Sequence, residues 1–206
     1  MIRRIAAVVL TSFLIAAPLA QAADLSPALT KIAPTDHVLG SASAPVTIIE
    51  YGSVACPACA SFNESVFPQL KAKYIDTGQV RYVFRPMLTG VPVIAVAGTR
   101  MAECAGNDKY FAVVDAVMRG QKEYYAWGES NIIAQPILVK IAASFGLSEA
   151  AYNTCASDAA GLSRLQAAHK AALDAGVRAT PTLYVNGKAV EQHDLDSVEA
   201  AIKAAK

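Results

Sequence analysis

Two cysteines that stand two residues apart are the part of this 206-residue sequence with the clearest chemical potential. Cys56 and Cys59 lie in the run ACPACA, and such a pair can serve a zinc site, haem attachment or redox exchange. The haem-attachment pattern is absent because the residue directly after Cys59 is not histidine. The other cysteines and the three histidines are too scattered to complete a zinc site. The pair therefore favours a redox-active dithiol, with a metal clip and a static disulfide as alternatives.

The segments around the pair predict where it lies in the fold. Residues 46–51 are rich in β-formers and bounded by proline and glycine, which is typical of a short buried strand. A helix is predicted to begin at Cys56, with Pro57 in its first turn, where a missing N–H costs nothing. Unpaired N–H groups at a helix N-terminus favour a thiolate. Cys59 falls one turn later on the apolar stripe, so we expect it to be more buried than Cys56.

The remaining sequence predicts a helical block between two β-containing halves. A second strand is expected over residues 80–84, helical periodicity runs from about 91 to 176, and strand character returns at 182–185. Asn186-Gly187 is a strong signal for a hairpin turn, and a last helix follows the hairpin. This order looks like an insertion into an α/β core.

Three segments give the chain a resemblance to the DsbA-like family of secreted thiol:disulfide oxidoreductases, within the thioredoxin superfamily. The first is EYGSVACPAC at 50–59, which has an acid six residues before the first cysteine. The second is VRYVFRP at 80–86, and the third, GVRATPTLYVNG at 176–187, is similar to the family's cis-proline loop and hairpin. The resemblance covers the chain from about residue 40 to 205.

The resemblance implies a thioredoxin-like α/β fold over residues 43–206. A helical insertion at about 88–176 would separate the βαβ half from the C-terminal ββα half. A lead-in segment at 23–42 would precede this domain.

The resemblance also implies roles for individual residues. Cys56 would exchange disulfides with a substrate, and Cys59 would resolve the mixed disulfide. Pro181 would follow a cis peptide bond that places Thr180 against the two sulfurs, where an extended substrate segment can pair with its backbone. Glu50, if buried under Cys59, would accept its proton, whereas a solvent-exposed acid at a strand end would have no such role.

The dipeptide between the cysteines departs from the family pattern. Strongly oxidising members often have histidine there, but this chain has Pro57-Ala58. An alanine side chain neither donates a hydrogen bond nor carries a charge. We therefore expect the pKa of Cys56 to lie above the ~3.5 of the most acidic case and nearer the ~7 of thioredoxin. A less stabilised thiolate makes the disulfide less oxidising, which leaves the direction of exchange open.

The other two cysteines are expected to form a structural disulfide. Cys104 lies on an apolar helical stripe and Cys155 ends a short helix of the same insertion, and some DsbA-like proteins have such a second pair. The bond would stiffen the cap over the site, while two buried free thiols are the alternative.

The N-terminus predicts export. Residues 1–22 combine two arginines, an apolar run at 5–17 that is too short to span a bilayer, and small residues before a cleavage site after Ala22. An uncleaved membrane anchor is the alternative. Removing this segment changes the formal charge from +1 to −1, and no basic stripe suggests a nucleic-acid partner.

These observations predict a periplasmic dithiol oxidase, acting as a monomer on exported proteins that are folding. The resemblance implies recharging by a membrane quinone-linked thiol oxidase and no separate cofactor. A reductase or isomerase is the alternative within the same chemistry, and a copper or zinc carrier using the CxxC pair is the alternative of another class.

Overall fold

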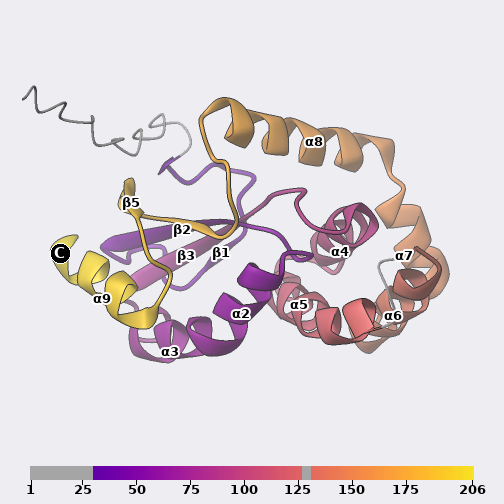
Figure 1. The fold of residues 1–206 in the computed structure, drawn as a ribbon, viewed down its shortest axis with the longest axis horizontal. Coiled ribbons are helices and arrows are strands. Elements are labelled where there is room, and N and C mark those ends of the chain that lie inside the picture. Colours follow the sequence, from indigo (N-terminus) through magenta and orange to yellow (C-terminus); the bar gives the residue numbers. More distant parts are fainter. Residues whose placement is uncertain (1–29, 127–130) are drawn as a thin grey trace, which may run out of the picture.

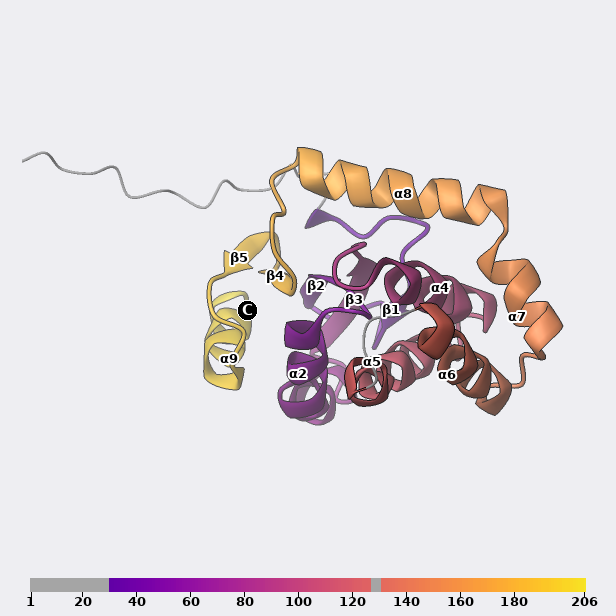
Figure 2. The ribbon, with the colours of Figure 1, turned by 45° about the vertical axis from the view of Figure 1, so that its right-hand side comes forward.

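The computed structural model describes residues 30–126 and 131–206, which form a mixed sheet with helices on both faces (Figures 1 and 2). The strands of this part lie in the order β1-β3-β2-β4-β5. The β2–β3 pair is parallel and the other neighbours are antiparallel. The strands are β1 (Val38–Leu39), β2 (Val46–Gly52), β3 (Val80–Pro86), β4 (Thr182–Val185) and β5 (Lys188–Val190). The predicted signal peptide at 1–22 lies outside the described residues.

Helices cover the sheet unequally. In Figure 1, α2, α3 and α9 lie below the sheet, α8 lies above it, and α4 to α7 gather at one end. Their bounds are α2 (Pro57–Ser65), α3 (Phe67–Leu70), the π-helical turn η1 (Lys71–Ile75), α4 (Pro92–Cys104), α5 (Tyr110–Ala126), α6 (Asn131–Ser144), α7 (Glu149–Ala156), α8 (Ala159–Asp174) and α9 (Leu195–Ala204). No helix in the two described ranges is long and apolar enough to cross a membrane.

The two faces of β2 pack against different cores because side chains alternate along a strand. Ile48 belongs to the large core that includes the apolar residues of α2, α4 and α5. Ile49 and Tyr51 belong to a smaller core that includes Ala172 of α8. Glu50, which falls between them, shares the face of Ile48 and therefore lies on the side of α2.

The elements predicted around the CxxC pair are confirmed, and so is the thioredoxin-like fold with its helical insertion. The predicted strands at 46–51 and 80–84 are one and two residues longer in the structure. Helices α4 to α8 fill the range predicted for the insertion, and they separate β2-α2-β3 from β4-β5-α9. Asn186 and Gly187 form the hairpin turn with φ values of 46° and 84°, which this turn type requires.

Part of the predicted lead-in belongs to the sheet, which differs from a domain that begins at residue 43. Strand β1 pairs with β3, with Val38 opposite Val83. The carboxylate of Asp36 also lies 2.7 Å from the guanidinium of Arg85 in β3, and both side chains are largely buried. No strand is predicted there, because a segment of two residues is too short to show the alternation of a strand.

Candidate active site

The two cysteines of the CxxC pair lie at the start of α2, directly after β2. Cys56 is the N-cap residue, in extended backbone conformation, and Pro57 is the first helical residue. Cys56 is half-buried, Cys59 has no exposed surface, and both are free thiols. The structure thus places the more accessible sulfur at the helix N-terminus and the buried one a turn later.

The surroundings of the pair make the two thiols very different acids. A hydrogen bond from Cys59 is the largest cause that lowers the pKa of Cys56, to about 5. Partial burial opposes it, while the Thr180 side chain and the backbone N–H groups of Cys59 and Ala58 lower the pKa further. The pKa of Cys59 is raised by its hydrogen bond to Cys56 and by burial. At neutral pH Cys56 is therefore a thiolate and Cys59 a thiol.

This pKa is lower than the value near ~7 that the Pro57-Ala58 dipeptide suggested. The reason is that the donors come from the Cys59 thiol, from Thr180 and from the helix backbone. The side chain of Ala58 contributes nothing, but its backbone N–H does.

The loop before β4 brings a second segment against Cys56. The peptide bond between Thr180 and Pro181 is cis. Sγ of Cys56 lies 3.4 Å from the Thr180 carbonyl oxygen, which accepts a hydrogen bond from this sulfur when it is protonated. Strand β4 pairs with β2 so that Thr182 lies opposite Tyr51. This register puts the cis-proline loop beside the end of β2, where α2 begins.

Glu50 is buried in the centre of the sheet, with 1% of its surface exposed. Its carboxylate accepts a hydrogen bond from the hydroxyl of Tyr82 on the neighbouring strand β3. Burial raises the pKa of Glu50 to about 7, against the lowering effect of the Tyr82 hydrogen bond. The nearby Glu50 charge in turn contributes to the raised pKa of Cys59. The solvent-exposed alternative for Glu50 therefore does not apply.

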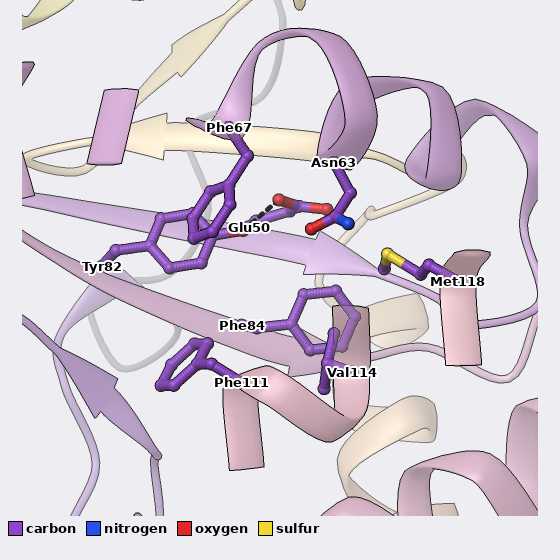
Figure 3. A pocket seen from close by; sticks show the side chains of 8 residues that line it. All are labelled: Glu50, Asn63, Phe67, Tyr82, Phe84, Phe111, Val114 and Met118. Atoms are coloured by element: carbon purple, nitrogen blue, oxygen red, sulfur yellow. Dashed lines mark hydrogen bonds between the residues drawn. The ribbon is translucent and has the colours of Figure 1, made fainter. Parts of the chain in front are cut away.

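A small pocket beside Glu50 explains the effect of its burial. The carboxyl group points toward Asn63 of α2, with aromatic rings on the other sides (Figure 3). Gly52 leaves room for this carboxyl, because a Cβ there would lie 2.6 Å from Glu50 Oε1. The pocket is lined by Glu50, Asn63, Phe67, Tyr82, Phe84, Phe111, Val114 and Met118. This mostly apolar lining leaves an ionised carboxylate poorly solvated.

Two residues of the insertion hold the segment before the helix and were missed by the sequence analysis. Buried Gln121 donates hydrogen bonds to the carbonyl oxygens of Val54 and Cys56, at 2.8 and 3.2 Å. The Tyr125 hydroxyl donates to the carbonyl oxygen of Ala55, at 2.7 Å. Both come from α5, more than 60 residues along the chain. A local pattern contains no signal for such contacts.

The second cysteine pair is joined by a disulfide. Cys104, the last residue of α4, is bonded to Cys155 of α7 across a sequence separation of 51. Their Cα atoms lie 6.2 Å apart. Buried Arg100, one turn before Cys104, donates a hydrogen bond to the Cys155 carbonyl oxygen at 3.2 Å. The bond thus ties two helices of the insertion together, away from the CxxC pair.

Metal-binding residues do not gather in the part of the chain that the structure describes. Within residues 30–126 and 131–206, no group of three or more His, Cys, Asp or Glu side chains is placed to hold an ion.

Comparison with known proteins assigns the chain to a family. The sequence model of the family described as Thioredoxin matches residues 32–204. The structure of alpha-DsbA1 from Wolbachia pipientis superposes with a TM-score of 0.74 and 27% identity, over 86% of this chain and 94% of that one. Oxidised BdbD from Bacillus subtilis superposes with a TM-score of 0.73 over 82% and 92%, and at 23% identity it supports the fold alone. The chain belongs to the thioredoxin family and is a DsbA-like member of it.

A curated relative has a matching activity in its name. A protein named as a protein-disulfide oxidoreductase in Rickettsia bellii is 31% identical over 179 residues, which is 85% of this chain and 66% of the relative. A second, from Rickettsia prowazekii, is 30% identical and covers 85% and 63%. The chain thus spans slightly less than two thirds of the length of these relatives.

Proposed function

We propose that this protein is a dithiol oxidase that introduces disulfides into exported proteins through Cys56 and Cys59. The single observation that carries the proposal is the contrast in acidity across the pair. The pKa of Cys56 is about 5, whereas the pKa of the buried Cys59 is raised. Enzymes of this chemistry need one sulfur that is a good leaving group and one that attacks only from within the protein.

The exchange balances in two steps. A substrate thiolate attacks Sγ of Cys56 in the oxidised pair, the S–S bond breaks, and Cys59 leaves and takes up a proton. A second substrate thiolate then attacks the substrate sulfur of the mixed disulfide and releases Cys56 as a thiolate. The substrate dithiol is oxidised by two electrons, and the CxxC pair is reduced by the same two.

The acidity of Cys56 supports one direction of exchange. A thiolate that the folded protein stabilises makes the reduced pair more favourable, and its disulfide correspondingly more oxidising. The lower-than-expected pKa of Cys56 therefore supports donation of disulfides over reduction. A matching segment of 47 residues is 45% identical to a Bacillus subtilis protein named disulfide bond formation protein D, which also supports this direction.

In this proposal Glu50 donates a proton to Cys59 and accepts it again. A group with a pKa of about 7 exchanges protons readily at neutral pH. Protonated Glu50 would give its proton to Cys59 as that sulfur leaves, and would take it back when Cys59 attacks the mixed disulfide. Tyr82, which donates to the carboxylate, holds Glu50 in place for this exchange.

The cis-proline loop provides the place where substrate would lie. Thr180 is half-buried and its carbonyl oxygen faces the Cys56 sulfur. An extended substrate segment pairing with the Thr180 backbone would bring its own sulfur to Cys56. Backbone pairing does not depend on substrate sequence, so this arrangement suits a broad range of exported proteins.

Location and recharging complete the proposal. The signal pattern of residues 1–22 supports action in the periplasm, where disulfides persist. Each turnover leaves a reduced pair, so a second oxidant is required. A membrane quinone-linked thiol oxidase would meet that need, and the protein would act as a monomer.

The redox equilibrium of the pair against glutathione tests the proposal. A midpoint near the ~−120 mV of a strong oxidase supports disulfide donation, and one near the ~−270 mV of thioredoxin supports the reductase alternative. Cys59→Ser should accumulate mixed disulfides on Cys56, while Cys56→Ser accumulates none. Stoichiometric zinc or copper bound to the purified dithiol would instead support the carrier alternative.

A further inference from the structure

The segment after β3 lies against the turn that carries the dithiol. The backbone N–H of Met87 donates to the carbonyl oxygen of Gly52 at 2.6 Å. Gly90 has a φ of +82°, and a Cβ there would lie 2.2 Å from the carbonyl oxygen of Ala55. Glycine is therefore needed for this close approach. Thr89, between these two contacts, is held next to the residues that lead into Cys56.

Ser53 connects this segment to the buried sulfur. It has no exposed surface. Its backbone N–H donates to Sγ of Cys59 at 3.4 Å, and its hydroxyl donates to the Thr89 carbonyl oxygen at 2.7 Å. The Ser53 hydroxyl oxygen also accepts from the backbone N–H of Ala55 at 3.2 Å. One buried serine thus fixes the Cys59 sulfur and the backbone of Thr89 together.

Thr89 connects the same segment to the cis-proline loop. Its Oγ1 lies 2.8 Å from Oγ1 of Thr180, within hydrogen-bonding distance. The Thr180 side chain is a donor to Cys56 and lowers the pKa of that thiol. A hydroxyl has one proton to donate. Either hydroxyl can donate in the Thr89–Thr180 pair, and the arrangement in which Thr89 donates leaves the Thr180 proton for Cys56.

We propose that Ser53 and Thr89 are positioning residues that direct the Thr180 hydroxyl onto the Cys56 sulfur and hold the cis-proline loop against the dithiol. The chain of contacts runs from Cys59 through Ser53, Thr89 and Thr180 to Cys56, so it joins the two sulfurs by a path outside the CxxC turn. This inference rests on the proposed function, because it concerns the reactivity of the same pair.

Thr89→Val tests the proposal because it removes the hydroxyl and keeps the shape of the side chain. The backbone bond from Ser53 to the Thr89 carbonyl oxygen stays possible. Without the Thr89 hydroxyl the Thr180 hydroxyl is no longer directed onto Cys56, and weakening that one hydrogen bond to the thiolate should raise the pKa of Cys56 by roughly half to one unit. The glutathione equilibrium should shift by roughly three- to ten-fold toward the disulfide form. The ultraviolet absorbance of the thiolate measures the first, and alkylation followed by mass spectrometry measures the second.

Three further variants separate positioning from general packing. Thr89→Ser keeps the hydroxyl donor, so the pKa of Cys56 should equal that of the unmodified protein. Ser53→Ala breaks the chain at the other end and should shift the pKa of Cys56 upward as Thr89→Val does. Thr77→Val removes an exposed hydroxyl whose hydrogen bonds are to Lys73, Tyr74 and Gln79, and should change neither readout. Melting temperatures identify any variant that fails to fold.

Two ionisable groups, Cys59 and Glu50, face Cys56, and both are the same in all these proteins. A folded Thr89→Val protein that titrates like the unmodified one overturns the inference, as does a Thr89→Ser protein that shifts as far as Thr89→Val. A missing low-pKa thiolate in the unmodified protein would instead contradict the proposed function itself.

Discussion

The two cysteine pairs of this protein differ most in the helix ends at which they lie. Cys56 is the N-cap of α2, and Cys104 is the last residue of α4. Accessibility does not separate them, since both are half-buried. N–H groups and the positive end of the helix dipole surround the first, whereas carbonyl groups and the negative end surround the second. The same residue type is therefore stabilised as a thiolate at one site and not at the other.

Nearby groups reinforce this difference. The CxxC pair has the cis-proline loop against one sulfur and buried Glu50 near the other. The second pair lies beside Arg100, whose guanidinium also contacts the partly exposed carboxylates of Glu103 and Asp158. Gly161 makes room for that guanidinium, because a Cβ there would lie 2.0 Å from Arg100 Cζ. The second pair is thus packed among groups that fix helices rather than groups that move protons.

The largest effect expected from this comparison is a separation of the two redox potentials. The CxxC pair should be reduced in a mild glutathione buffer that leaves Cys104–Cys155 intact. Strong oxidases lie near ~−120 mV and structural disulfides below ~−300 mV, so the midpoints should differ by at least ~100 mV. Differential alkylation and mass spectrometry of the two peptides give both midpoints in one titration. Reduction of both pairs at the same glutathione ratio would remove the distinction between them.

Removal of the second pair should affect stability and leave the active-site acidity unchanged. Closing a loop across 51 residues is worth about 4 kcal/mol in the chain-entropy treatment. Cys104→Ala combined with Cys155→Ala should lose about 2–4 kcal/mol in urea unfolding. The pKa of Cys56 should stay at about 5, because none of the groups that lower it belongs to the second pair. The matched control is the unmodified protein after strong reduction, because reduction breaks the Cys104–Cys155 bond without a substitution.

Local sequence was sufficient to predict the elements that carry the site. The proline after Cys56, the short β-rich run before it and the Asn186-Gly187 turn each determine backbone conformation within a few residues. The strand-to-helix transition and the hairpin therefore appear where they were predicted. Strand β1 was not predicted, because it is defined by its pairing with β3 and not by its own two residues.

The acidities of the site could not be predicted in the same way. The helix N–H groups and the Pro57-Ala58 side chains, which local sequence indicates, predict a higher pKa for Cys56 than the structure gives. The further donors are the side chains of Cys59 and of Thr180, which is 124 residues away. Tyr82, Gln121 and Thr89 were missed for the same reason. Each is an ordinary residue in its own segment and gains its role only through a contact between distant segments.

The smallest expected effect is on the pH dependence of stability, and it comes from Glu50, the buried acid near the CxxC pair. The pKa of Glu50 is about 7 in the folded protein and 4.5 in the reference state, so the folded protein holds this proton more tightly than the unfolded chain. The stability that results is complete below pH ~4.5 and is lost as the pH rises through ~7. The loss amounts to at most roughly 3 kcal/mol. A glutamine at this position does not titrate, so the Glu50→Gln protein does not lose this stability as the pH rises.

Urea unfolding of the reduced proteins at several pH values measures this loss. The stability of Glu50→Gln relative to the unmodified protein should increase from pH ~4.5 to ~7 and stay constant above that. Asp174→Asn, which changes an exposed acid that pairs with Lys170, is the matched control and should not show this increase. Cys56 titrates in all three proteins, so the differences retain only its charge interaction with Glu50, which is one of the causes of the raised Glu50 pKa. Parallel pH profiles for Glu50→Gln and the unmodified protein would mean that Glu50 carries no raised pKa, and the proton supply assigned to it at Cys59 would then have to come from solvent.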